Sequence, residues 1–171
     1  MNYEKTESEM NFNFPEPSIF DIEQSNLYKS LSRGDGIKAC DFVYLASKNK
    51  MLLIEAKKSS PNPANPDSRQ NVIAYTQDIH FKIIHSLFLL LGMAGLRTYQ
   101  YTSTPPQWID KVTNPATRFI PVLVVKDMQN EWLPPIADCL RKEFSGTRKA
   151  YNLDDLIVIN EEKAREKGFI R

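Results

Sequence analysis

Apolar residues cluster in two short runs in the first third of the chain and recur every three or four positions in a longer segment. Residues 37–46 and 51–57 are rich in aliphatic and aromatic side chains, which is typical of strands. Polar residues separate them, so an antiparallel hairpin is the simplest connection. From residue 67 or 68 to about residue 92 or 95, apolar side chains recur at helical spacing and predict one long helix.

The remaining segments predict shorter elements. Residues 1–17 are polar and contain two prolines, so we expect a flexible N-terminal tail. Ser18 precedes an amphipathic stretch and predicts a helix over residues 19–27. A glycine-rich turn follows at residues 33–36. The later predicted elements are a loop over 102–117, a strand over 119–125, a helix from 135 or 136 to about 144, a strand over 156–159 and a charged terminal helix.

The order helix, strand, strand, helix, strand, helix, strand predicts an α/β fold. Its central sheet should be mixed, because the first pair of strands forms a hairpin, and it should be flanked by helices. The length suits one core, so we expect residues 18–171 to form a single domain. Beyond His85 the long helix is apolar all round, which predicts burial on every side or a subunit interface, such as a homodimer through residues 72–96.

The charges nearly cancel, with 22 basic and 21 acidic residues. A nucleic-acid enzyme of this composition needs its positive charge concentrated locally, because no global excess attracts phosphates. The best basic cluster consists of Arg141, Lys142, Arg148 and Lys149. It either grips a nucleic-acid backbone or is a solvated helix face.

The chain shows no secretory or membrane pattern. Its start is polar and acidic, and its longest apolar run is about half of a membrane span. Cys40 and Cys139 both lie in apolar segments, as reduced core thiols do. We therefore expect a cytoplasmic protein with no membrane association.

Three charged side chains stand in or beside the apolar runs. Asp41 lies inside the first run, and Glu55 directly follows the apolar part of the second. Isolated carboxylates there carry a desolvation cost of several kcal/mol unless they are paired or bound to a metal. Glu55 and Lys57 are two residues apart, so both point to the same face of a strand.

The hairpin register decides whether Asp41 joins them. A three-residue loop over residues 47–49, with Asn49 in the left-handed conformation, pairs Ala46 with Lys50 and places Asp41 opposite Glu55. A loop of two or four residues without a bulge sends Asp41 to the other face. We therefore expect an odd-numbered loop or a β-bulge.

Two carboxylates and a lysine on one sheet face are the parts that metal-assisted phosphodiester hydrolysis requires. Mg²⁺ or Mn²⁺ prefers oxygen ligands, to which the Ala56 carbonyl is a possible addition. An ammonium group nearby orients the nucleophile or stabilises the transition state. The alternative is that Asp41 and Glu55 lie near strand ends, exposed or paired with lysines.

Asp41 followed by Glu55-Ala56-Lys57 after thirteen residues resembles the motif of the PD-(D/E)XK nuclease superfamily. This resemblance implies a restriction-endonuclease-like core, arranged α-β-β-β-α-β over roughly residues 18–160. It also implies that Asp41, Glu55 and Lys57 are catalytic and that Asp41 and Glu55 bind the metal. Restriction, phage defence and DNA repair are the functions that such enzymes serve.

The sequence departs from that pattern in places. Cys40 stands where the motif has proline, and one strand fewer precedes Glu55 than the superfamily has. Many members carry a metal-binding glutamate on the first helix, for which Glu23 is the candidate, with a solvated surface role as the alternative. Some branches use a glutamine and a tyrosine on the later helix. Gln70 and Tyr75 are spaced one residue too far for that pattern, and Gln77 lacks a matching tyrosine.

We take Gln77, Arg141 and Lys142 as candidate nucleic-acid contacts. His80 and His85 are five residues apart, so they do not share a helical face as a metal-binding pair does. Trp108 and Trp132 lie in or beside loops, where they pack onto the domain or stack on bases.

Two functions remain open from the sequence. One is a Mg²⁺-dependent DNA endonuclease, with RNA as an alternative substrate. The other is a catalytically inactive binding or assembly module on the same fold, acting through a partner protein by way of its apolar helix.

Overall fold

The centre of the fold is a five-stranded mixed sheet in the order β3-β4-β5-β6-β7. The computed structural model describes residues 1–31, 33–95 and 106–171. The strands of this sheet are β3 (Ile19–Phe20), β4 (Phe42–Ser47), β5 (Lys50–Ser59), β6 (Arg118–Asp127) and β7 (Ile157–Asn160). The first three are antiparallel neighbours, while β5, β6 and β7 are parallel. The predicted α/β fold with a mixed sheet is confirmed.

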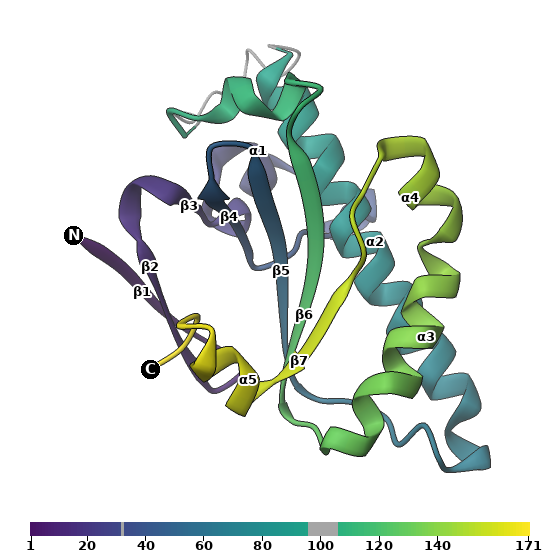
Figure 1. Ribbon diagram of the computed structural model, residues 1–171. Coiled ribbons are helices and arrows are strands. Elements are labelled where there is room, and N and C mark those ends of the chain that lie inside the picture. Colours follow the sequence, from purple (N-terminus) through teal and green to yellow (C-terminus); the bar gives the residue numbers. More distant parts are fainter. Residues whose placement is uncertain (32, 96–105) are drawn as a thin grey trace.

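Helices and a hairpin cover the two faces of the sheet (Figure 1). On one side lie α2 (Arg69–Ala94), α3 (Leu133–Glu143) and α4 (Ser145–Tyr151). On the other side lie α5 (Glu161–Glu166) and a two-stranded hairpin of β1 (Asn2–Glu7) and β2 (Met10–Pro15). The small helix α1 (Asn26–Ser30) lies between β3 and β4 in the chain.

Side-chain alternation along the strands produces two separate cores. In β5, Met51 and Leu53 pack with the helices, whereas Leu52, Ile54 and Ala56 pack with the hairpin. This is the two-residue period of a strand buried on both faces. It places Glu55 and Lys57, which follow Leu53 in that period, on the side of α2.

The N-terminal segment is not the flexible tail that we expected. Residues 2–15 form the β1–β2 hairpin, and Met10, Phe12 and Phe14 of β2 are each 1% exposed. The rings of Phe12 and Phe14 pack against that of Phe42 of β4, with centroids 5.0 Å away for Phe12 and 5.8 Å away for Phe14. The expectation was wrong because Met10, Phe12 and Phe14 alternate with polar residues, which is a strand pattern.

The helix predicted over residues 19–27 is also wrong. Ile19 and Phe20 instead pair with Tyr44 and Val43 at the edge of the sheet, and a short 3₁₀ helix follows. Helix α1 begins only at Asn26, because the Ser25 hydroxyl accepts a hydrogen bond from the Tyr28 amide. The two-residue strand β3 also adds a second strand of the sheet ahead of β5, the strand that carries Glu55.

The β4–β5 hairpin has the register that brings Asp41 beside Glu55. Phe42 pairs with Ile54 and Leu45 with Met51, and the register shifts by one residue before Ser47 pairs with Lys50. The expected bulge is therefore present, whereas the three-residue loop is not. Asn49 is absent from the residues with positive φ in the described chain, so its predicted left-handed conformation is wrong.

Helix α2 ends where the sequence predicted, with Gly95 as its C-cap. It is not buried on every side: Phe81 is 50% exposed, Phe88 49% and Leu91 36%. None of the helices in the described part of the chain has the length and apolar character of a membrane crossing. The predicted strands at 119–125 and 156–159 and the helices at 135–144 and the C-terminus are confirmed. The loop predicted over 102–117 lies partly outside the described residues, and the rest contains a 3₁₀ helix, Ile109–Thr113.

Candidate functional site

The start of β4 and the middle of β5 bring two buried carboxylates together. Asp41 directly precedes β4, and because Phe42 pairs with Ile54, Asp41 comes next to Glu55. Asp41 is 3% exposed and Glu55 is fully buried. Buried carboxylates need partners, so their contacts decide what this site can do.

Asp41 completes the edge of β5. Its Oδ2 accepts a hydrogen bond from the Ala56 amide at 2.7 Å. The Ala56 carbonyl accepts a hydrogen bond from Ser8 Oγ at 3.0 Å. Pairing of β5 with β4 reaches only to Ile54, so β4 offers no backbone partner to Ala56. The side chains of Asp41 and Ser8 instead satisfy the amide and the carbonyl of Ala56. The Ala56 carbonyl, a possible metal ligand from the sequence, is already bonded to Ser8.

Two lysines share one oxygen of Glu55. Lys57 Nζ lies 3.1 Å and Lys82 Nζ 2.7 Å from Glu55 Oε1. Both oxygens of Glu55 are buried without a hydrogen-bond partner among the described residues, and the two ion pairs hold Oε1, which leaves Oε2. Because an unpartnered buried carboxylate oxygen is costly, this atom is a candidate ligand for a cation.

Three carboxylates converge beside Asp41. One oxygen each of Glu7, Glu23 and Asp41 lies within 4.8 Å of the other two. Glu23 comes from the 3₁₀ helix Ile22–Gln24, and Glu7 ends strand β1. The structure thus brings the predicted ligand Glu23 to Asp41, while Glu55 is not a member of this group of three.

Lys5 balances part of this negative charge. Its Nζ lies 3.0 Å from Asp21 Oδ2, 3.4 Å from Glu7 Oε2 and 4.0 Å from Glu23 Oε2. Asp21 is buried and also accepts a hydrogen bond from the Tyr3 hydroxyl at 2.7 Å. The closest contact of Lys5 is therefore with Asp21 rather than with the group of three.

Burial makes the carboxyl groups of this site hard to ionise. Loss of solvation, with the neighbouring charge of Glu55, raises the pKa of Asp41 to about 8. Burial likewise raises the pKa of Glu55 and of Glu23, against the opposing effect of nearby lysines. Burial alone would lower the pKa of Lys82, but the charges of Glu55 and Asp41 outweigh it and raise that pKa. Additional positive charge would therefore favour the ionised carboxylates.

Helix α2 anchors the segment that carries Asp41. The Cys40 amide donates to Ser86 Oγ at 2.8 Å, and the Lys38 amide donates to His85 Nδ1 at 3.1 Å. Cys40 and Ser86 are both fully buried. The same helix also reaches Glu55 through Lys82, so α2 holds both halves of the site.

The predicted nucleic-acid contacts do not converge on this site. Gln77 is exposed on α2, and no hydrogen bond among the described residues joins it to Asp41, Glu55 or Lys57. Arg141 and Lys142 are exposed on α3, where Arg141 pairs with Asp138 at 2.7 Å. The three residues therefore stay predictions, without a contact to the candidate centre.

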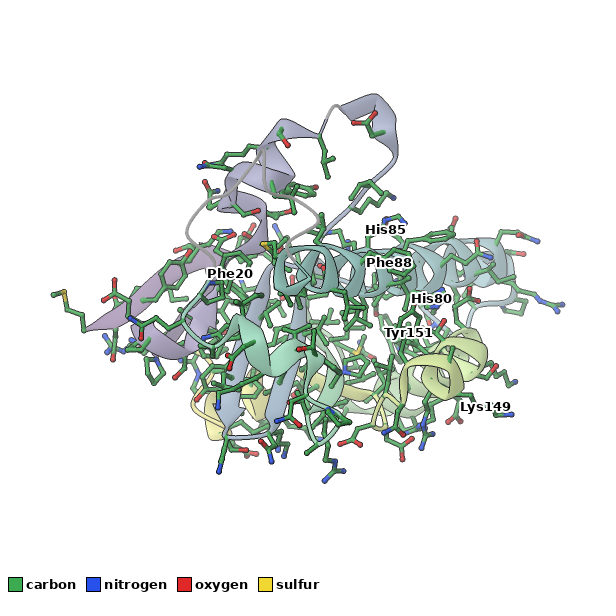
Figure 2. The ribbon with its side chains drawn as sticks, turned by 90° about the horizontal axis from the view of Figure 1, so that it is seen from above. Phe20, His80, His85, Phe88, Lys149 and Tyr151 are labelled. Carbon is green, nitrogen blue, oxygen red and sulfur yellow. The ribbon has the colours of Figure 1, made fainter. Side chains whose placement is uncertain are left out.

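The histidines and tryptophans have packing roles. His80 Nε2 lies 2.7 Å from Thr147 Oγ1, which joins α2 to α4. Figure 2 shows His80, His85 and Phe88 in succession along α2. Trp108 is buried and its indole donates to the Pro17 carbonyl at 3.0 Å, while Trp132 packs half-buried against the core. Cys40 and Cys139 are both free thiols; Cys40 is buried, as expected of a core residue, whereas Cys139 is half-buried.

Sequence analysis missed three residues that contact the site, namely Glu7, Asp78 and Lys82. Glu7 lay in the segment taken for a tail. Lys82 carried a signal that was available: it is a cation in an apolar stretch, three residues after Ile79 and four before Ser86, both buried. Asp78, four residues before Lys82, shares its helical face.

The residues present fit a hard divalent cation. Their donors are carboxylate oxygens, the type that Mg²⁺ and Mn²⁺ prefer, and Glu55 Oε2 is an orphaned buried acceptor. Comparison with known proteins adds no further constraint, since no family model, curated protein or solved structure matches this chain.

Proposed function

We propose that this protein is a metal-dependent nuclease of the PD-(D/E)XK type that hydrolyses phosphodiester bonds, with DNA as its substrate. One observation carries the proposal. Asp41 and Glu55 are buried next to each other at the start of β4 and in β5, and Lys57 Nζ lies 3.1 Å from Glu55. Burying two carboxylates beside each other is unfavourable for folding alone, so a function that uses their charge is the better explanation.

The order of elements supports the restriction-endonuclease-like core. Strands β3, β4 and β5 are followed by helix α2 and then by β6, which is parallel to β5. One departure is that α1 lies between β3 and β4 rather than ahead of all three strands. The part of the pattern from Asp41 onward, which also holds Glu55 and Lys57, is unaffected.

Asp41, Glu55, Glu23 and Glu7 are the residues that would hold the cation. When bound, Mg²⁺ or Mn²⁺ lowers the pKa of water and neutralises charge on a phosphate. Lys57, whose side chain is 25% exposed, can donate to a phosphate oxygen or to the attacking water. Glu55 holds this ammonium beside the centre.

The direct test is a cleavage assay on supercoiled plasmid, linear duplex, single-stranded DNA and RNA with Mn²⁺, Mg²⁺ or EDTA. Lys57→Ala and Glu55→Gln are expected to lower the rate roughly a hundredfold or more. Lys58→Ala is the matched control, because Lys58 is the next residue, is 58% exposed and pairs with Glu9 instead. Absence of cleavage by the wild type with either metal contradicts the proposal.

The second candidate is an inactive nuclease-fold module that binds a partner protein. Two observations favour it: Lys57 and Lys82 already neutralise Glu55, and Phe81 and Phe88 expose about half of their surface on α2. A working centre gains thermal stability from Mn²⁺, by about 2.7 kcal/mol at a hundred times Kd. An inactive module with a vestigial centre shows no shift in melting temperature.

A further inference from the structure

Helix α2 places a carboxylate directly against the motif lysine. Lys57 Nζ lies 3.1 Å from Asp78 Oδ2, with hydrogen-bond geometry, and 3.1 Å from Glu55 Oε1. Its ammonium group is therefore held between two carboxylates that come from different elements, β5 and α2. The other oxygen of Asp78 is held by Lys38 Nζ at 2.5 Å.

Five side chains form a chain of alternating charge. Its order is Lys38, Asp78, Lys57, Glu55 and Lys82, with each neighbour within 3.1 Å. Asp78 and Lys82 are one helical turn apart on α2, so one rigid element fixes two of these charges. Lys57 lies at the middle, where both of its neighbours restrict it.

A lysine ammonium group sits on a flexible four-carbon stem and does not hold one position unless it is restrained. Glu55 restrains Lys57 from one side only, and Glu55 Oε1 also binds Lys82. Asp78 supplies the second restraint. Partial burial by itself would raise the pKa of Asp78, but the hydrogen bonds and charges of Lys38 and Lys57 together outweigh burial and lower that pKa, so Asp78 stays charged near neutral pH.

We propose that Asp78 is a positioning residue that acts through Lys57 and fixes its ammonium group beside Glu55. The inference rests on the proposed nuclease function. Asp78 does not contact the group of Glu7, Glu23 and Asp41, so its effect is on the geometry of Lys57 rather than on metal binding. Small misplacements of a catalytic group lower rates by as much as a hundredfold.

The test is Asp78→Asn, which keeps the shape of the side chain and removes its charge. We expect kcat to fall about 10- to 100-fold, with KM within about twofold and unchanged Mn²⁺ affinity. Asp78→Glu is expected to recover part of the loss. In a Lys57→Ala background, Asp78→Asn is expected to cost nothing further, because both changes remove the same function.

Asp154→Asn is the matched control. The side chain of Asp154 is 23% exposed and that of Asp78 is 30% exposed. Asp154 pairs with Arg118 at the start of β6, whereas Lys57 lies beside the end of that strand, at Val125. If Asp78 formed only a structural ion pair, Asp78→Asn and Asp154→Asn would have similar activity. Equal kcat for Asp78→Asn and wild type, or a further loss in the Lys57→Ala background, overturns the inference.

An activity-free readout separates this inference from the proposed function. The ¹⁵Nζ resonance of Lys57 is expected to be sharp in the wild type and broadened in Asp78→Asn, but unchanged in Asp154→Asn. If the wild type cleaves no substrate, the nuclease proposal fails. The line width of the Lys57 resonance still reports whether Asp78 restrains the Lys57 ammonium group. An identical Lys57 resonance in Asp78→Asn and wild type overturns the inference in either case.

Discussion

The carboxylate of Asp41 accepts a hydrogen bond from the Ala56 amide at 2.7 Å, one residue beyond Glu55 in the partner strand. The contact gives Asp41 a structural role besides the proposed chemical one. One carboxylate oxygen of Asp41 also lies in the group formed with Glu7 and Glu23. An alanine substitution at this position removes both roles, so asparagine, which still accepts the bond, is the informative change.

Asp41 makes stability depend on pH. Its pKa is raised by burial and by Glu55 to about 8, well above the value of an unfolded aspartate. The folded state therefore binds more protons between about pH 4 and pH 8, and the stabilisation present at low pH is lost as pH rises through about 8. As the pH rises from 5 to 8 without divalent metal, the unfolding free energy of Asp41→Asn is expected to increase relative to that of the wild type by at least about 1 kcal/mol. Urea unfolding at each pH measures this, and parallel curves contradict it.

Glu7 links the N-terminal hairpin to metal binding. Glu7→Gln removes one of the three converging carboxylates and is expected to weaken Mn²⁺ binding by about tenfold or more, since ligand charge sets affinity. Calorimetry measures the change. Glu4→Gln is the control, because Glu4 lies on the same strand but pairs with Arg171. Equal Mn²⁺ affinities of Glu7→Gln and Glu4→Gln would show that Glu7 does not bind the metal.

The sequence predicted the core of the fold from local signals. The apolar run before Glu55, the helical spacing after residue 68 and the β-branched run at 119–125 each matched an observed element. The pairing of Asp41 with Glu55 followed from the two-residue period and one assumption about the loop. A bulge was one of the two expected ways to obtain this pairing and is present, whereas the left-handed conformation predicted for Asn49 is wrong.

The missing half of the site depends on contacts that no local pattern encodes. Glu7 reaches Asp41 because the β1–β2 hairpin folds back on Phe42, a contact across about thirty residues of sequence. Lys82 and Asp78 reach Glu55 and Lys57 only because α2 crosses that face of the sheet. Propensity alone also misassigned residues 19–27, where pairing of Ile19 with Tyr44 prevails over helix formation.

Ser86 is expected to stabilise the segment directly before Asp41. Its hydroxyl accepts from the buried Cys40 amide and donates to the Lys82 carbonyl. Ser86→Ala leaves that amide without its partner, which costs about 1–3 kcal/mol of unfolding free energy. Ser30→Ala is the control, since among the described residues that hydroxyl bonds within its own turn, to Leu27. Thermal unfolding with equal shifts in both variants would contradict this role.

The hairpin is expected to be part of the folding unit. Phe12 is 1% exposed and its ring contacts those of Phe14 and Phe42. Phe12→Ala is expected to lower the unfolding free energy by about 3–5 kcal/mol. Asn11→Ala, at the neighbouring exposed position of β2, is expected to change it by less than about 0.5 kcal/mol. A small effect of Phe12→Ala in denaturant unfolding would restore the view of residues 1–17 as a dispensable tail.

The exposed aromatic side chains of α2 predict self-association. Exposed side chains occur at Phe81, at Phe88 seven residues later and at Leu91 three residues after that, a spacing that places them on one face of α2. Figure 2 labels Phe88 on this helix. A second copy of the chain, placed across a twofold axis, would cover this face with the same residues. We expect a dimer in light scattering at micromolar concentration and a monomer for Phe88→Glu, with Lys149→Glu on α4 as the control. A strictly monomeric wild type contradicts the homodimer.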